Sequence, residues 1–126
     1  APGGVVFDIG GTTSAALAAI ERGTPALEAG QTGERSQSNG SLMRILPIAV
    51  WGLKHESRAD LARLAATASR VTHNHPTCRA ACAVYTLIVD DLLRGHDRED
   101  ALERSIDDVR TASGAEPART EMYPPA

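Results

Sequence analysis

Lysine, aromatic side chains and cysteine are all scarce in this chain. Lys54 is the only lysine, and the 126 residues include only one Trp, one Phe and two Tyr. A core must therefore be built mainly from Ala, Leu, Ile and Val, and the abundance of alanine favours helices that approach one another closely. The near-absence of lysine beside many arginines fits a GC-rich coding sequence better than a binding role.

The missing features also exclude several classes of protein. A net charge of -3 provides no basic surface for nucleic acid or for an acidic membrane. Cys78 and Cys82 are too few for a secreted disulfide framework. No signal-peptide pattern occurs, and no apolar run is long enough to span a bilayer. We therefore expect a cytoplasmic protein with no nucleic-acid-binding patch and no membrane partner.

The length and the apolar pattern predict a single all-α domain over residues 1–126, arranged as an antiparallel helix array. We expect a loop at 23–40, which either has a function or lacks order, and a loose tail at 113–126. The chain begins at Ala1 without an initiating methionine, which fits either a processed end or the edge of a longer polypeptide. The expected helices cover about residues 12–21, 40–54, 57–72, 76–94 and 97–112.

Local signals mark where these helices begin and end. Ser57 with an acid three residues later is typical of a helix N-terminus, and Gly23 and Gly95 are typical stops. Pro47 should kink the second helix or split off its first turn. The segment 80–89 is apolar almost all round, which predicts that the helix 76–94 is enclosed by others. The side chains expected to face inward are Ala16, Leu17 and Ile20; Leu42, Ile45, Leu46, Ala49, Val50 and Leu53; Leu61, Leu64, Ala65, Ala68 and Val71; and Leu102, Ile106 and Val109.

A polar, glycine-containing turn at residues 36–41 runs directly into an apolar helix pattern. The first turn of such a helix leaves backbone N–H groups unpaired at the positive end of the helix dipole, and this arrangement accepts an anion such as phosphate. The alternative is that Asn39 or Ser41 only caps the helix.

A second polar segment, from Thr72 to Pro76, separates two predicted helices. His73 and His75 precede a helix start, where a histidine can donate to an anion that also meets free backbone N–H groups. The alternative is that His73 is a C-terminal cap and His75 a packed loop residue.

Other reactive groups form weaker patterns. Cys78 and Cys82 lie four residues apart behind the two histidines, but structural zinc sites draw their ligands from loops, and these cysteines lie in an alanine-rich helix. Ser41 has no predictable base–acid pair beside it, so no nucleophilic triad is supported. We therefore expect no catalytic nucleophile and no metal ligands among these residues.

Three segments resemble the ADP-ribosylglycohydrolase family, which includes the dinitrogenase-reductase-activating glycohydrolases and other ADP-ribosylhydrolases. The stretch S-N-G-S-L-M-R at 38–44, followed by Pro47, is similar to the family pattern G-N-G-[SA]-[LM]-M-R…P. The order F-D-I-G-x-T at 7–12 and the segment T-H-N-H-P at 72–76, with Ala80 and Tyr85 after it, are similar to two further patterns of that family. The resemblance covers about residues 5–112 and only the middle of a typical family domain.

The resemblance implies a fold, an activity and a ligand. Family members are all-helical, metal-dependent enzymes that remove ADP-ribose from modified targets, so this chain is expected to form part of an orthogonal helix bundle. In such a bundle the turn residues would face the diphosphate, and the histidine loop would face ribose or phosphate. Ser38 departs from the usual first glycine, so we expect the backbone to come less close to a phosphate there. The implied ligand-binding residues are Ser38, Asn39, Gly40, Ser41, His73 and His75.

The acid pairs of this chain do not match the metal ligands of the family. Relatives hold magnesium or a similar ion with Thr-Asp-Asp-Thr and Asp-x-Asp-Thr segments, whereas Asp90-Asp91 and Asp107-Asp108 lack the threonines and lie within helical patterns. We interpret both pairs as helix-surface charges and expect no metal ligand, no bound cofactor and no catalysis in this chain by itself.

Three hypotheses follow for the function. The chain is a segment of an enzyme that hydrolyses the glycosidic bond to ADP-ribose, a non-catalytic module that binds ADP-ribose or another nucleotide, or a purely structural helical domain. Its expected partners are an ADP-ribose-type ligand and either the remaining segments of the same domain or a second copy of the chain.

Overall fold

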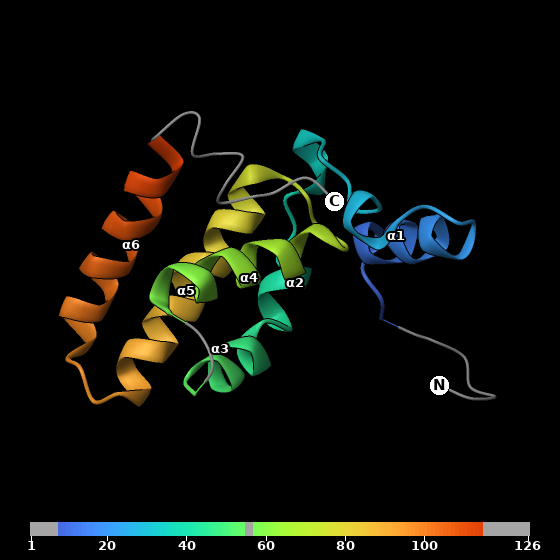
Figure 1. Cartoon of the computed structure of the whole chain (residues 1–126). Coiled ribbons are helices and arrows are strands. Elements are labelled where there is room, and N and C mark those ends of the chain that lie inside the picture. The colour runs from blue at the N-terminus through green and yellow to red at the C-terminus, as the bar shows by residue number, and fades with distance from the viewer. Residues whose placement is uncertain (1–7, 55–56, 115–126) are drawn as a thin grey trace.

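The regular elements of this protein are all helices in residues 8–54 and 57–114, the part of the chain that the computed structural model describes. Figure 1 shows the last two long helices running side by side in opposite directions, with the preceding helix crossing the first of these two and the N-terminal helix at the opposite edge of the molecule. The predicted all-α fold is confirmed. The elements are α1 (Gly11–Glu21), the 3₁₀ helices η1 (Ala26–Glu28) and η2 (Glu34–Ser36), α2 (Gly40–Met43), α3 (Leu46–Gly52), α4 (Arg58–Arg70), α5 (Pro76–Leu93) and α6 (Arg98–Gly114).

Most helix ends follow the local signals in the sequence. The Ser57 side chain accepts a hydrogen bond of 3.2 Å from the backbone N–H of Asp60, which satisfies one free donor at the start of α4. Pro76 occupies the first turn of α5, where its missing N–H is not needed. Gly95 follows α5 with a φ of +87°, a conformation that glycine adopts without strain. These boundaries were predicted correctly.

Pro47 divides the predicted helix 40–54 into two. α2 ends at Met43, and α3 starts at Leu46 with the proline in its first turn. Since proline has no N–H to donate, it tolerates only the first turn of a helix, so the apolar pattern continues while the helix restarts. The predicted split is confirmed.

Small side chains bring the central helices together. Ala62 of α4, Ala83 and Leu87 of α5 and Val109 of α6 form one buried cluster. A second cluster joins Ile45 to α4 and α5 through Ala65 and Cys82. Alanine in these positions permits close helix contact, as the composition predicted.

The inward face of α6 differs in part from the expected one, although Val109 is buried as predicted. Leu102 was expected in the core, but its side chain is 47% exposed. The residues that face α5 are Ala101, Ser105 and Val109, which follow one another at a spacing of four. Their small side chains allow α6 to approach closely, and this rotation of the helix turns Leu102 outward.

The expected inward stripes of α1 and α3 are also wrong in part. Ala16 and Ala49 are fully buried, but Leu17, Leu46 and Val50 are exposed, at 44%, 45% and 54%. Both helices bury the face that carries alanine, and the larger apolar side chains on the adjacent face remain in solvent.

The predicted enclosure of α5 is wrong as well. Ala81 and Tyr85 are exposed, and one face of α5 lines an open apolar groove with Leu42 of α2. The groove-lining residues are Leu42, Thr77, Ala80, Ala81, Val84, Tyr85 and Ile88. The apolar pattern on all sides of α5 therefore did not mean that the other described helices cover every side of it.

The loop at 23–40 is folded against the connection between α4 and α5. Gln31 forms an isolated parallel bridge with His73, and the backbone N–H of Asn74 donates to the Gln31 carbonyl at 3.0 Å. Gly30 lies so close to the Arg70 carbonyl that a Cβ atom would overlap it. The loop thereby fixes the position of the polar turn that follows it.

Two of the predicted features lie at the ends of the chain. Phe7 and residues 115–126 lie outside the described residues, whereas residues 113 and 114 belong to α6 rather than to a tail. Among the described helices, none is both long and apolar enough to cross a membrane.

Candidate functional site

The polar turn at 36–41 lies against the segment that joins α4 to α5. A hydrogen bond of 2.8 Å links Ser38 Oγ and His73 Nε2, although the two residues are 35 positions apart in the chain. Gly40 is packed directly against the same imidazole, where a side chain could not fit without displacement. The structure therefore brings together the two polar segments in which the sequence placed candidate ligand-binding residues.

The His73 ring is fully buried and bonded at both nitrogens. Its Nδ1 lies 2.8 Å from Thr72 Oγ1, and its Nε2 binds Ser38. Burial disfavours the imidazolium and lowers the pKa of His73, and the nearby positive charge of Arg44 lowers it further. His73 is therefore a neutral residue that holds the turn, and its direct contact with ribose or phosphate stays a prediction.

Arg44 connects the end of the turn to the histidine segment. Its Nη2 donates to Thr72 Oγ1 at 2.7 Å and to the Ala68 carbonyl at 3.0 Å. The contact with Ala68 satisfies a carbonyl in the last turn of α4, where no helical N–H is available. Sequence reasoning did not assign Arg44 and Thr72 to the site, although both belong to the motifs that carried the family resemblance.

Ser41 supports the turn from inside. Its side chain is buried, and its hydroxyl oxygen lies 3.0 Å from Ser69 Oγ, which also donates to the His73 carbonyl at 2.9 Å. The Cys82 thiol donates to the same Ser41 oxygen at 3.5 Å. The Ser41 hydroxyl is thus engaged with α4 and α5.

Ser38 and Asn39 occupy the outer side of the turn, and both are exposed. Asn39 precedes α2 in the N-cap position, but its side chain makes no capping hydrogen bond. The expectation that Asn39 or Ser41 merely caps a helix therefore does not describe their side chains. Both residues lie at the surface beside the first turn of α2, and Ser38 Oγ is bonded to His73.

His75 has a structural role that the sequence did not suggest. It is the N-cap of α5, where its Nδ1 accepts a hydrogen bond of 3.2 Å from the backbone N–H of Thr77. Its Nε2 lies 3.4 Å from Glu34 Oε1 on η2. His75 thus links the start of α5 to the loop that carries the turn.

The two cysteines lie beneath the turn and are free and buried. The Cys78 thiol lies 3.8 Å from the Ser36 carbonyl and 3.7 Å from the Ser38 carbonyl. Burial disfavours the thiolate and raises the pKa of Cys78. This environment suits a packed, unreactive thiol rather than a nucleophile.

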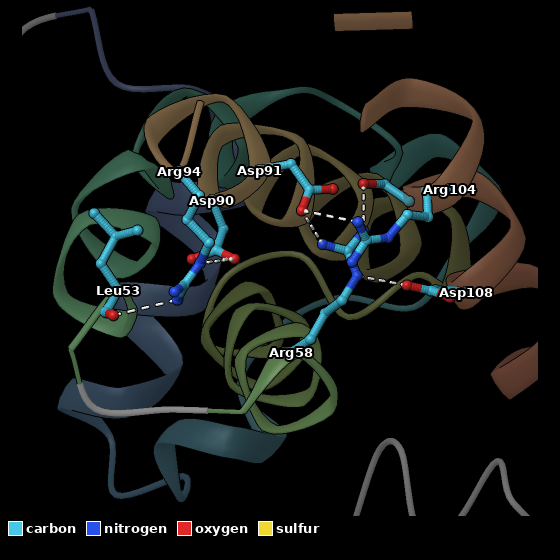
Figure 2. A network of polar contacts seen from close by, with 8 residues as sticks. Leu53, Arg58, Asp90, Asp91, Arg94, Arg104 and Asp108 are labelled. Atoms are coloured by element: carbon cyan, nitrogen blue, oxygen red, sulfur yellow. Dashed lines mark hydrogen bonds and ion pairs between the residues drawn. The ribbon is translucent and has the colours of Figure 1, made fainter. Parts of the chain in front are cut away.

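Asp90 and Asp91 are not the surface charges that their sequence pattern predicted. Their exposed fractions are only 4% and 1%, because both lie on α5 between α3, α4 and α6. Figure 2 shows the arginines that neutralise them. Arg94 Nε donates to Asp90 at 2.9 Å and its Nη2 to the Leu53 carbonyl at 3.2 Å, which joins α5 to the end of α3.

Asp91 is held by Arg58, at the start of α4. The Arg58 guanidinium donates to Asp91 Oδ1 and to Asp108 Oδ2 at 2.6 Å each, and to Ser105 Oγ at 3.0 Å. Desolvation alone would lower the pKa of Arg58, but the hydrogen bonds and negative charges of the two carboxylates outweigh it and the pKa is raised. The guanidinium thereby fastens α4 to both α5 and α6. Asp107 and Asp108 are exposed, as predicted.

The described residues do not fit a metal centre. In 8–54 and 57–114, no three His, Cys, Asp or Glu side chains gather so that they could hold a metal ion. The buried carboxylates are bound by arginines instead. No step of a reaction can be assigned to a metal held by these residues.

Comparison with known proteins identifies the family of this chain. Residues 1–123 match the family model of ADP-ribosylglycohydrolase. The chain is 36% identical over 72 residues to ADP-ribosyl-[dinitrogen reductase] glycohydrolase of Rhodospirillum rubrum, and the aligned stretch is 57% of this chain and 24% of that relative. The chain thus spans about a quarter of the relative's length, and no solved structure matches it. The family resemblance of the sequence is confirmed: the chain belongs to the ADP-ribosylglycohydrolase family.

Proposed function

We propose that this chain supplies the ADP-ribose-binding surface of an ADP-ribosylglycohydrolase. In this proposal Ser38, Asn39 and the backbone of Gly40 meet the diphosphate. The loop that contains His73 and His75 lies on the ribose side. The bond that the complete enzyme would hydrolyse is the glycosidic bond between ADP-ribose and its target.

One observation carries the proposal: the 2.8 Å contact between Ser38 Oγ and His73 Nε2. It joins two family motifs that are far apart in sequence, and Ser38 and Asn39 are exposed residues at this junction. Phosphate groups bind where hydroxyl, amide and backbone N–H donors converge, and a glycine permits a close approach of the backbone.

The role proposed for the chain by itself is binding and orientation. Because the described residues do not fit a divalent cation, the magnesium expected for the family would be held by other segments of a complete enzyme. The chain spans about a quarter of its relative, which leaves room for such segments in the relative. A cytoplasmic location stays a prediction of the sequence.

A second candidate is a module that binds ADP-ribose or another nucleotide without turnover. The observation that favours it is the pairing of Asp90 with Arg94 and of Asp91 with Arg58, which leaves these buried carboxylates committed to packing. The open apolar groove along α5 is where the remaining segments of the domain, or a second copy of the chain, would be expected to lie.

Titration calorimetry with ADP-ribose tests the proposal. We expect binding by the 126-residue chain, weakening of that binding in Asn39→Ala, and no change in Asp107→Ala, whose side chain is exposed and far from the turn in sequence. Absence of heat at two temperatures and high ligand concentration would contradict the proposal and favour a structural domain. Incubation of an ADP-ribosylated substrate with this chain and magnesium is a further test, because turnover would exclude the non-catalytic module and would also contradict the absence of metal ligands from the described residues.

A further inference from the structure

Four polar side chains form a continuous hydrogen-bonded series that ends at Ser38, in the candidate ligand-binding turn. Arg44 Nη2 lies 2.7 Å from Thr72 Oγ1, which lies 2.8 Å from His73 Nδ1. His73 Nε2 lies 2.8 Å from Ser38 Oγ, and Ser38 is exposed on the outer side of the turn. Thr72 and the His73 ring are buried between two exposed residues, Arg44 at one end and Ser38 at the other, and Ser38 is the end that lies in the turn.

The direction of each hydrogen bond in this series can be worked out from Arg44, its first member. The guanidinium of Arg44 has no acceptor, so Thr72 Oγ1 must accept from it. Thr72 then retains one hydroxyl proton, and in the part of the chain that the structure describes His73 Nδ1 is its remaining hydrogen-bond partner. A proton on Nδ1 would leave the buried Thr72 hydroxyl without an acceptor, which is the unfavourable alternative.

We propose that Thr72 donates to His73 Nδ1, that His73 Nε2–H donates to Ser38 Oγ, and that the Ser38 hydroxyl proton is thereby directed outward to an acceptor oxygen of the ligand. Arg44, Thr72 and His73 are positioning residues in this arrangement, and Ser38 is the residue that touches the ligand. The inference deepens the proposed function and rests on it only for the identity of that ligand.

The arrangement determines which ligand groups Ser38 can bind. A hydroxyl whose oxygen already accepts from His73 presents a donor, so it favours a phosphate or another anionic oxygen over a cation or an N–H group. The lowered pKa of His73 fits a neutral ring with one proton to donate. Serine stands here where the family motif has glycine, so this donor is an addition to the backbone contacts of the turn.

The tautomer of His73 can be measured without any ligand. A long-range proton–nitrogen correlation spectrum of the ¹⁵N-histidine-labelled chain distinguishes Nε2–H from Nδ1–H, and the signals of His73 are those absent from the spectrum of His73→Gln. We expect the Nε2–H tautomer for His73. A predominant Nδ1–H tautomer, or the mixture typical of an exposed imidazole such as that of His96, would overturn the inference.

Paired variants of Thr72 test whether the hydrogen-bonded series affects ligand binding. Thr72→Val removes the hydroxyl but keeps the shape, and we expect it to weaken ADP-ribose binding by about five- to thirtyfold, the loss of one oriented hydrogen bond. Thr72→Ser should restore the Nε2–H tautomer and most of the affinity. Thr77→Val, an exposed threonine at the start of α5, is the matched control and should change neither.

The failure of this inference is distinguishable from the failure of the proposed function. If His73 has the Nε2–H tautomer but the protein does not bind ADP-ribose, the proposed hydrogen-bond directions are correct and the proposed function is wrong. If the wild-type protein and a folded Thr72→Val variant bind ADP-ribose equally well, the proposed function holds and the positioning role of Thr72 is wrong. If Thr72→Val does not fold, the tautomer of the wild-type protein still decides the question.

Discussion

Gly40 lies directly against the imidazole of His73. A Cβ atom added to Gly40 would be 2.8 Å from His73 Cε1 and 3.2 Å from both His73 Nε2 and Thr13 Oγ1. The ring cannot retreat, because it is fully buried and hydrogen-bonded at both nitrogens. The absence of a side chain at Gly40 is therefore what allows the turn and the histidine segment to meet.

Gly40→Ala should disturb both stability and the site. We expect unfolding free energy measured in urea to fall by about 1–3 kcal/mol, because the added methyl group overpacks a contact with no room to relax. ADP-ribose binding should weaken in the same variant, since the displaced ring releases Ser38.

Gly33→Ala is the matched control for this change. Its nearest neighbour would be Ser36 Oγ at 3.9 Å, an ordinary contact, and its φ of -69° suits alanine. We expect a stability within about 0.5 kcal/mol of wild type. Equal effects of the two glycine substitutions would contradict the importance of the close approach.

Asp91→Asn should destabilise the bundle because it removes one charge of a buried ion pair. The change keeps the shape of the side chain, but Arg58 then has only Asp108 as a charged partner at hydrogen-bond distance among the ion pairs of this contact. We expect a loss of about 2–4 kcal/mol in chemical denaturation, below the range for a fully enclosed pair because Arg58 reaches solvent.

Asp107→Asn provides the comparison on the same network of helices. Asp107 pairs with Arg110 at 3.1 Å, but both side chains are largely exposed. An exposed pair of this kind contributes little, so the change should be within about 0.5 kcal/mol of wild type. If Asp91→Asn were equally neutral, the arginine contacts would not be what stabilises the packing of α4.

Helix boundaries could be predicted because their causes are local. Ser57, Pro76 and Gly95 act through the backbone of their immediate neighbours, and Pro47 cannot occupy a helix interior. Each of these signals is read correctly without knowledge of the rest of the chain.

The buried faces could not be predicted equally well, because they depend on the partner helix. On α6 the apolar pattern contains both Leu102 and Ala101, and the sequence favours the larger side chain. The observed packing buries Ala101 because small residues allow a closer approach to α5. Likewise, nothing local indicates that Asp91 meets Arg58, 33 positions away.

The candidate site was predictable as two segments but not as a network. The turn and the histidine loop each have recognisable polar composition before a helix start. The links among Arg44, Thr72 and His73 depend on how α2 sits on α4, which sequence periodicity does not specify. The buried position of the His73 ring follows from the same packing.

The contrast between Ile45 and Val50 tests the corrected core directly. Ile45 is fully buried between α4 and α5, whereas Val50 is 54% exposed although both fall on the predicted stripe. Ile45→Ala should cost about 2–5 kcal/mol of stability, and Val50→Ala should be within about 0.5 kcal/mol of wild type. Thermal and urea unfolding would measure both, and a large loss in Val50→Ala would show that α3 packs differently.

The buried His73 should make folding stability depend on pH. Its pKa in the folded state lies below the value of 6.5 that applies to the unfolded chain, because burial disfavours the imidazolium. Well above pH 6.5 the ring is neutral in both states and the full stability is present. As the pH falls through about 6.5, His73 binds a proton in the unfolded state but not in the folded state. Folding stability is therefore lost as the pH falls, until the pH reaches the pKa of the folded state.

His73→Gln should remove this part of the dependence, whereas His96→Gln, which changes an exposed ring, should leave it intact. Urea unfolding of the three proteins between pH 7.5 and about 5.5 measures the difference. An identical slope in wild type and His73→Gln would mean that His73 is accessible to protons in the folded chain, and the hydrogen-bonded order from Arg44 to Ser38 would then lose its central member.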